Sequence, residues 1–407
     1  MSAFLVGHAT HPDWRMALAL AAAQIDAQRA RQDGSGAGPL TLGFAYFTDA
    51  YAGHADALFA ELKLRWPGIS WVGSIGVGVA ASGVEYFDEP GLALMLAPMP
   101  AGRFEVFSGA HPISRVEPFS ALVHADPSTP DLGELVAEMS DRTTSGYLFG
   151  GLASSRAATV HLADGVWRGG LSGVAFTADV ALVSRVTQGC QPVGPSRTVT
   201  GAERNIVVEL DGRPALRCLF DDLGIAPGSD PRAALPLLRS TLVGLGDAHD
   251  GATARPGRFG SDVRVRNLVG LDPGRDAIAI GEFVEPGMRL AFCRRDVEAA
   301  RRDLVRICTE IREELESPLE ATAPAHGLPV DAAAMEPGAT RPVHGAIYVS
   351  CAGRGGPHFG GPSAELRIVQ RALGDVPLVG FFAGGEIARH HVYGYTGVLT
   401  VFTGSAN

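Results

Sequence analysis

One pattern of apolar and polar positions occurs three times along the chain, at residues 40–98, 120–177 and 344–403. Each copy has an apolar run, a polar break, a stretch with helical spacing, a second apolar run, a polar turn region and a last apolar run. The helical spacing is clearest in the second copy, where apolar residues recur at i, i+3, i+4 and i+7: Leu132, Leu135, Val136 and Met139. Each copy is therefore predicted to fold as strand, helix, strand, strand.

The predicted strands are near-continuous apolar runs, which is typical of sheets that are covered on both faces. Gly73, Gly150 and Gly380 stand at the same point of the three copies, within the second apolar run. In the third copy Ser363 lies directly before the predicted helix and is expected to cap its N-terminus. We therefore expect an α/β (α+β) fold in which repeated βαββ units form stacked mixed sheets flanked by helices.

Other elements are expected outside the three copies. The chain opens with a predicted strand at 4–7 and a helix at about 13–30, and residues 31–39 have the composition of a flexible connector. Before the third copy, a hairpin about Glu285-Pro286-Gly287 is predicted within AIAIGEFVEPGMRLAFC, followed by a long helix. Residues 317–342 are rich in Pro, Gly and Ala, as in a surface linker.

A chain of 407 residues is too long for one ordinary core, so two domains are expected. We place the boundary near residue 230. Residues 1–230 then hold the first two βαββ copies. Residues 231–407 hold the hairpin, the long helix and the third copy.

Charge and cysteine content exclude several classes of function. The net charge is −10 and the sequence contains no Lys/Arg-rich run, so binding to nucleic acid is not expected. No apolar stretch approaches the roughly 18 residues of a membrane span, and the N-terminal residues lack a secretory signal pattern. The five cysteines are odd in number and include no CxxC, which fits reduced thiols in the cytoplasm.

Polar residues gather where the strands of the third copy are predicted to end. Cys351 and Arg354 follow its first strand, Glu365 lies on its helix, and Gly385 and Glu386 follow its second strand. Ligands of open α/β sheets bind beyond the carboxyl ends of strands. Arg354 would bind a carboxylate, Glu386 would bind an ammonium group, and Gly355 and its neighbours would let a ligand approach the backbone. We expect this edge to bind a zwitterion or a carboxylate.

Simpler roles are open for the same residues. Cys351 could be a small buried side chain, and Arg354 and Glu386 could form a structural salt bridge with each other. If Arg354 lies close to Cys351, its charge should lower the pKa of the thiol. A zinc site needs further Cys or His ligands at suitable spacing. No such ligands accompany the pair His8 and His11 or the adjacent pair His390 and His391.

The same residues give the sequence a family resemblance. SCAGRG, the helix with Glu365, and VPLVGFFAGGEI at 376–387 are similar to the C-terminal domain of the FIST family. The first two copies resemble the N-terminal FIST domain, with LFGGLAS at 148–154 and QGCQPVGP at 188–195 matching its Gly-rich signatures. The resemblance covers nearly the whole chain, and we include Gly150 and Gly151 of the LFGGLAS segment among the expected ligand-binding residues.

The resemblance implies a sensory module that binds small ligands such as amino acids. Since the sequence contains no kinase, cyclase or receptor segment, such a sensor would act on a partner, for example a histidine kinase, a chemoreceptor or a cyclic-dinucleotide enzyme. Some proteins of this type bind haem and report nitric oxide, and His124 and His161 are the candidate ligands here by location. A third hypothesis is a thiol-dependent enzyme that uses Cys351. A sensor is favoured over an enzyme because no complete catalytic set is present.

Overall fold

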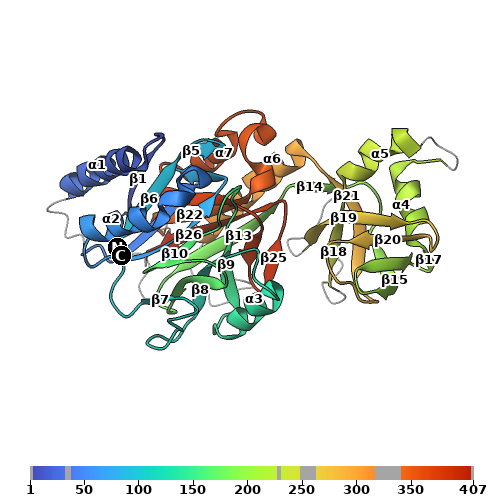
Figure 1. Cartoon of the computed structure of the whole chain (residues 1–407), viewed down its shortest axis with the longest axis horizontal. Helices are drawn as coiled ribbons and strands as arrows, with labels where there is room; N and C mark the ends of the chain where they lie inside the picture. Colours follow the sequence, from blue (N-terminus) through green and yellow to red (C-terminus); the bar gives the residue numbers. More distant parts are fainter. Residues whose placement is uncertain (1–2, 33–37, 227–230, 248–262, 317–340, 405–407) are drawn as a thin grey trace. The chain divides into compact units, whose positions relative to one another are not determined.

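The computed structural model describes residues 3–32, 38–226, 231–247, 263–316 and 341–404 (Figure 1). Packing divides the chain into two compact units. The first is formed by the residues up to 187 together with those from 304 onward, and the second by residues 188–303. The third copy therefore packs in the same unit as the first two copies. The sequence boundary near residue 230 divides the chain in another way and stays a prediction.

Each of the three copies folds as predicted. In the first copy the first strand, helix, second strand and last strand are β2 (Leu42–Thr48), α2 (Ala55–Arg65), β3 (Ser70–Gly76) and β6 (Leu92–Ala97). In the second copy they are β8 (Ser120–Ala125), α3 (Leu132–Asp141), β9 (Tyr147–Leu152) and β12 (Leu171–Phe176). In the third copy they are β22 (Val343–Cys351), α7 (Ala364–Leu373), β23 (Leu378–Ala383) and β26 (Thr396–Thr403). In every copy the first strand pairs in parallel with the second and antiparallel with the last. The predicted mixed α/β fold is confirmed.

The hairpin of each copy joins the sheet of another copy. The hairpins are β4 (Gly78–Ala81) with β5 (Val84–Phe87), β10 (His161–Ala163) with β11 (Val166–Trp167), and β24 (Glu386–Ala388) with β25 (His391–Tyr393). β4 pairs with β23, β10 pairs with β3, and β24 pairs with β9. The outer positions of the sheets are taken by β1 (Leu5–Ala9), β7 (Phe104–Phe107) and β13 (Leu182–Gln188). Three equivalent six-stranded sheets result, joined by a cyclic exchange of hairpins.

The recurring glycines have one structural cause. A Cβ at Gly73, Gly150 or Gly380 would lie 1.8, 1.9 or 1.7 Å from a carbonyl oxygen of the neighbouring parallel strand. Side chains from all three sheets then meet in one apolar core, which includes Phe44, Phe149 and Phe381. The outer face of the first sheet is covered by α1 (Trp14–Gln32) and α2 (Figure 1). Both faces of that sheet are therefore buried, as its apolar strands predict.

The second unit is a closed antiparallel barrel. Its six strands are β15 (Arg197–Glu203), β16 (Ile206–Leu210), β18 (Thr241–Gly246), β19 (Arg264–Asp272), β20 (Ala277–Ile280) and β21 (Arg289–Arg295), and the pairing of β18 with β21 closes the ring. The short strands β14 (Cys190–Pro192) and β17 (Arg213–Pro214) pair with β21 and β16, and the unit also contains the helices α4 (Ala215–Leu223) and α5 (Pro231–Ser240). The long predicted helix is α6 (Val297–Glu316), which starts in the second unit and ends in the first.

Two local predictions are wrong. The segments on either side of Glu285-Pro286-Gly287 are strands, β20 and β21, but they do not pair with each other as a hairpin. β20 pairs with β16 and β19, and β21 pairs with β14, β15 and β18. Barrel closure thus replaces the expected hairpin. Ser363 precedes α7, yet its hydroxyl accepts the backbone N–H of Glu85 at 3.0 Å instead of capping the helix.

Most of the predicted linker at 317–342, and residues 33–37 of the predicted connector, lie outside the described residues. Among the helices that the structure describes, none is long and apolar enough to cross a membrane.

Candidate ligand-binding site

Cys351, Arg354, Glu365 and Glu386 come together in one buried cluster of the first unit. β22 ends at Cys351 and continues into two short 3-10 turns, Ala352–Arg354 and Gly356–Phe359, so that Arg354 turns back into the protein. Glu365 lies in the first turn of α7, and Glu386 is the first residue of β24. Arg354 and Glu365 are each 1% exposed and Glu386 is fully buried.

Arg354 forms its ion pair with Glu365. Its Nη2 and Nε donate to Glu365 Oε1 at 2.6 and 3.0 Å. The same carboxylate accepts hydrogen bonds from the hydroxyls of Tyr348, at 2.6 Å, and Ser350, at 3.0 Å. The guanidinium also lies over the ring of Phe359, 5.0 Å from its centroid. The structural pair considered from the sequence, Arg354 with Glu386, is therefore not the one that forms.

One guanidinium nitrogen of Arg354 and one carboxylate oxygen of Glu386 have no hydrogen-bond partner among the described residues. Arg354 Nη1 is buried and has no hydrogen-bond partner among the described residues. Glu386 accepts the backbone N–H and the hydroxyl of Thr396 through Oε2, at 3.0 and 2.7 Å. The thiol of Cys351, a weak donor, interacts with the Glu386 carboxyl group, and Oε1 of that group has no hydrogen-bond partner in the part of the chain described. Leaving a buried polar group without a partner costs about 1–3 kcal/mol.

A further carboxylate, Glu85, belongs to the cluster and was missed from the sequence. It lies on β5, in the hairpin that the first copy adds to the third sheet. Backbone N–H groups of Ser363 and Gly356 donate to its carboxylate, and its charge interacts with that of Glu365. Its Oε1 also lacks a partner within the described residues. No local pattern around Glu85 indicates this position, because only the exchange of hairpins brings it there.

The cluster holds three carboxyl groups and one guanidinium, and burial opposes their ionisation. Burial raises the pKa of Glu386 to about 8 and that of Glu85 to about 7. Burial, followed by the nearby Glu386 carboxylate, raises the pKa of Cys351 to about 12. Arg354 acts on the pKa of Cys351 in the expected, lowering direction, but desolvation exceeds the attraction of the guanidinium and the pKa is raised overall. A thiol with this pKa is protonated at neutral pH and is a poor nucleophile.

The predicted glycines lie at the same junction, and the protein itself requires them. Gly150 and Gly151 of β9 pair with Ile387 and Glu386 of β24. A Cβ on Gly151 would lie 2.7 Å from Val349, and a Cβ on Gly355 would lie 2.0 Å from the ring of Phe87. Gly385 accepts the N–H of Leu152 through its carbonyl, at 2.8 Å. These close contacts give each glycine a packing role, whether or not a ligand also contacts it.

The residues at the carboxyl ends of the first strands of the three copies share a pattern of hydrogen bonds. Thr48 Oγ1 accepts the N–H of Gly91 at 2.9 Å, and the Asp126 carboxylate accepts that of Gly169 at 3.1 Å. The thiol of Cys351 likewise receives the backbone N–H of Tyr395. All three donors lie just before the last strand of their copy. Cys351 therefore has a structural role that Thr48 and Asp126 perform in the other copies.

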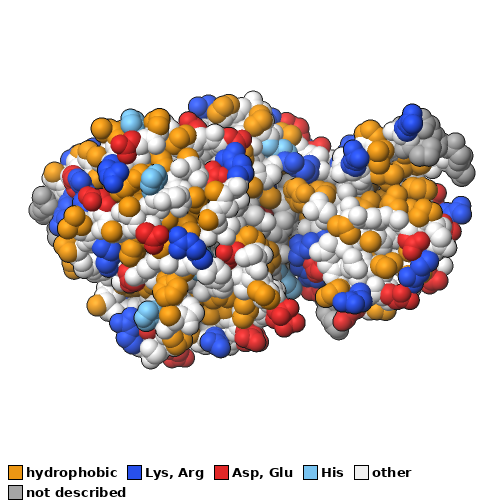
Figure 2. Space-filling view, in the orientation of Figure 1, with side chains coloured by type: hydrophobic (Ala, Val, Ile, Leu, Met, Phe, Trp, Pro, Cys, Tyr) orange, Lys and Arg blue, Asp and Glu red, His pale blue; other side chains and the backbone are white. Residues whose placement is uncertain are grey.

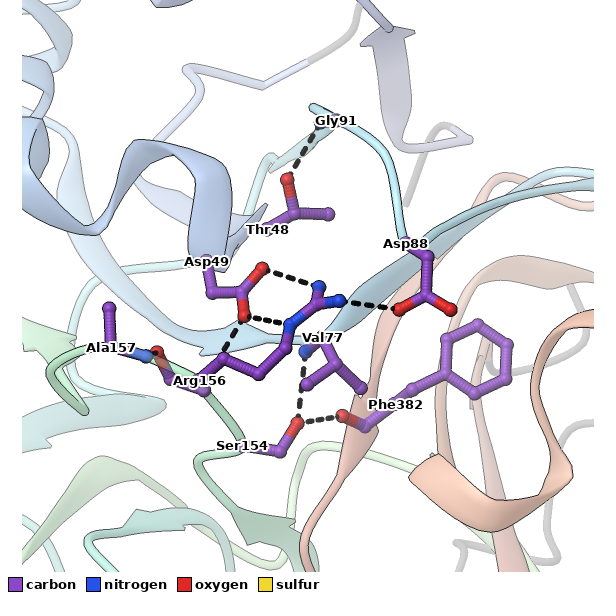
Figure 3. A network of polar contacts seen from close by, with 10 residues as sticks. Thr48, Asp49, Val77, Asp88, Gly91, Ser154, Arg156, Ala157 and Phe382 are labelled. Atoms are coloured by element: carbon purple, nitrogen blue, oxygen red, sulfur yellow. Dashed lines mark hydrogen bonds and ion pairs between the residues drawn. The ribbon is translucent and has the colours of Figure 1, made fainter.

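The copies also meet in a polar network beside these strand ends (Figure 3). The hydroxyl of Ser154 accepts the N–H of Val77 at 3.0 Å and donates to the carbonyl of Phe382 at 2.5 Å, which joins segments from all three copies (Figure 3). Arg156 pairs with Asp49 at 2.8 Å and with Asp88 at 2.9 Å. Arg156 is more than half exposed, whereas Asp49 is 8% exposed and accepts from both Nε and Nη2 of Arg156.

His161 does not fit the role of a haem ligand, and His124, whose Nδ1 has no partner among the described residues, is enclosed by aromatic side chains of the core. His161 uses both ring nitrogens, toward the Ser172 hydroxyl at 2.5 Å and the Gly169 carbonyl at 3.2 Å. His124 Nε2 contacts the hydroxyl of Tyr46 at 3.1 Å, and its ring is packed edge-on against Tyr46 and Phe381. Burial lowers the pKa of His124 to about 3, so this side chain is a neutral part of the core. No group of His, Cys, Asp or Glu that could hold a metal ion occurs among the described residues.

Comparison with known proteins agrees with this architecture. The FIST N domain matches residues 41–213 and the FIST C domain matches residues 215–389. The chain belongs to the FIST family. Uncharacterised proteins of Mycobacterium tuberculosis and Mycobacterium bovis are 32% identical to it over 419 residues, and each alignment covers 98% of both chains. FIST domains are sensory and signalling domains, and the FIST C match includes the whole Arg354–Glu365–Glu386 cluster.

Proposed function

We propose that this FIST protein is a sensor that binds a small zwitterion of the amino-acid class at the cluster of Arg354, Glu365 and Glu386. The observation that supports it most is the pair of unsatisfied buried atoms, the donor Arg354 Nη1 and the acceptor Glu386 Oε1. A ligand carboxylate would accept from the first and a ligand ammonium would donate to the second. Both unsatisfied atoms would thereby gain charged partners.

Glu365 leaves one side of the Arg354 guanidinium available. Because Nε and Nη2 are both used by Glu365, the guanidinium is fixed in place while Nη1 keeps its donor capacity. Cys351 is the partly exposed member of the cluster, whereas Arg354 and Glu386 are buried. A ligand would therefore enter past the Cys351 thiol. The junction that it reaches contains β24 of the third copy, β9 of the second and β5 of the first.

This position suits a sensor because a ligand there would affect all three copies. We expect the bound protein to act on a separate signalling partner, such as a histidine kinase, a chemoreceptor or a cyclic-dinucleotide enzyme, in the cytoplasm. Purification of the tagged chain from its native host, with and without an amino acid that stabilises it in thermal unfolding, would identify the partner. Recovery of no signalling protein in either condition would contradict this part of the proposal.

Tryptophan fluorescence offers a direct binding test. All four tryptophans lie in the first unit, so the thermal unfolding that they report is that of the unit with the cluster. A ligand that binds only the folded state should add roughly 2.7 kcal/mol at 100 times its Kd. We would screen amino acids, and compare each hit with its amine-only and carboxylate-only analogues. A zwitterion should stabilise the unit more than either analogue.

The pH dependence of binding adds a second test. An ammonium ligand needs ionised Glu386, whose pKa is about 8, so the affinity should rise as the pH increases from 6 to 8. Glu386→Gln should remove this rise and weaken binding. No stabilisation by any amino acid, or conversion of a stabilising ligand into product, would contradict the proposal.

A further inference from the structure

The second unit contains a cavity that the proposed sensor site does not use. Its volume is about 340 Å³, and it lies between β14, α4, α5 and β21. Pro192, Val193, Leu223 and Leu237 supply its apolar wall, and Gln191 and Arg294 are among its polar residues. A volume of this size suits a small organic molecule, and the wall combines these four apolar residues with five polar ones.

The cavity carries one uncompensated positive charge. Asp222 lies in its wall, but both oxygens of this carboxylate accept from the guanidinium of Arg197, each at 2.6 Å. The two side chains are 6% and 10% exposed, so Asp222 is neutralised by a largely buried, bidentate partner. Arg294, in contrast, has no ion-pair or hydrogen-bond partner for its side chain among the residues described. The cavity is therefore electrically suited to an anion.

The QGCQPVGP segment, noted in the sequence for its resemblance, builds one side of this cavity. Gln191, Pro192 and Val193 line it directly. A Cβ on the next residue, Gly194, would lie 2.1 Å from Asp222 Oδ2, so only glycine lets the segment pass the Arg197–Asp222 pair. The segment thus shapes a cavity of the second unit, which explains its composition.

We propose that this cavity binds a small aliphatic monocarboxylate. Arg294 binds the carboxylate, the Gln191 amide donates a further hydrogen bond, and the aliphatic chain packs on Val193 and Leu237. An amino group on the ligand gains nothing, because the Asp222 carboxylate is already saturated by Arg197. The ligand class therefore differs from the zwitterion proposed for the first unit, and this site stands on separate observations.

Calorimetric titration of the full chain with hexanoate tests the proposal. Hexanoate should bind, whereas hexylamine should not. Arg294→Gln should weaken hexanoate binding at least about tenfold, a loss of about 1.4 kcal/mol. Arg295→Gln is the matched control, because side chains alternate along a strand and this one points to the other face of β21, and it should change the affinity less than about twofold.

Val193→Trp provides a second, independent variant. The larger side chain fills the cavity and should abolish hexanoate binding without removing any charge. Circular dichroism and thermal unfolding establish that each variant is folded before titration. The proposal is overturned if hexanoate does not bind, if hexylamine binds equally well, or if folded Arg294→Gln or Val193→Trp binds hexanoate as tightly as the natural chain.

Discussion

Replacing Glu365 with Leu should destabilise the first unit severely. The change leaves the guanidinium of Arg354, which is 1% exposed, without its counter-charge, and removes the acceptor of the Tyr348 hydroxyl. Removing one partner of a buried ion pair costs about 3–5 kcal/mol. We expect a loss near the upper end, about 5 kcal/mol, because the Ser350 hydroxyl also loses its acceptor.

Urea unfolding followed by tryptophan fluorescence measures this loss for the first unit alone, since the second unit contains no tryptophan in its sequence. The double variant Arg354→Met/Glu365→Leu removes both charges and should be more stable than the single variant. Glu316→Leu is the control: its pair with Arg312 lies in the first unit, is exposed and should contribute about 0.5 kcal/mol or less. A single variant that loses less than about 1 kcal/mol, or a double variant less stable than the single one, would refute the reasoning.

Three further predictions follow from the same unit. The pKa of Glu386 in the folded protein is about 8, above the usual 4.5, so this side chain contributes stability at low pH that is lost as the pH rises toward 8. The free energy of unfolding should therefore fall more steeply from pH 5 to 8 in the natural chain than in Glu386→Gln, as urea titrations would show. Cys351, the partly exposed cysteine, should react with iodoacetamide before the four buried ones, yet far more slowly than a free thiol at pH 7.4, as timed mass spectrometry would reveal. Gly73→Ala and Gly150→Ala should each lower the unfolding free energy by about 3 kcal/mol or more, while Gly133→Ala, whose added methyl meets open space, should be neutral or stabilising.

Each of these has a result that would count against it. Parallel pH profiles of the natural chain and Glu386→Gln would show that this carboxyl does not titrate between pH 5 and 8. Earlier modification of one of the four buried cysteines would contradict the partial exposure of Cys351. A fully stable Gly73→Ala would mean that the neighbouring strand can move away from the added methyl group.

The repeated units could be predicted because their signals are local. Apolar runs, helical spacing and the recurrence of Gly73, Gly150 and Gly380 all lie within stretches of about 60 residues. The cluster residues Cys351 and Glu386 could be brought together from the sequence because they follow neighbouring parallel strands, and Arg354 and Glu365 come from the connection between those strands.

The remaining features depend on distant pairing, which leaves no local trace. The addition of β5 to the third sheet places Glu85 in the cluster, and the closure of the barrel separates β20 from β21. The pKa of Cys351 was misjudged because the sequence showed the nearby positive charge but not the depth of burial. Whether Arg354 pairs with Glu365 or with Glu386 likewise depends on how the turns after β22 are directed.

The cyclic exchange of hairpins also has a consequence for synthesis on the ribosome. β9 is translated long before β24, the strand that covers its edge, and the second unit is made in between. Until β24 emerges, the nascent chain presents an uncovered edge of apolar strand, which is a template for aggregation. Maturation of the first unit therefore waits for synthesis of the third copy, and a chain that terminates before β24 would be a substrate for chaperones and proteases.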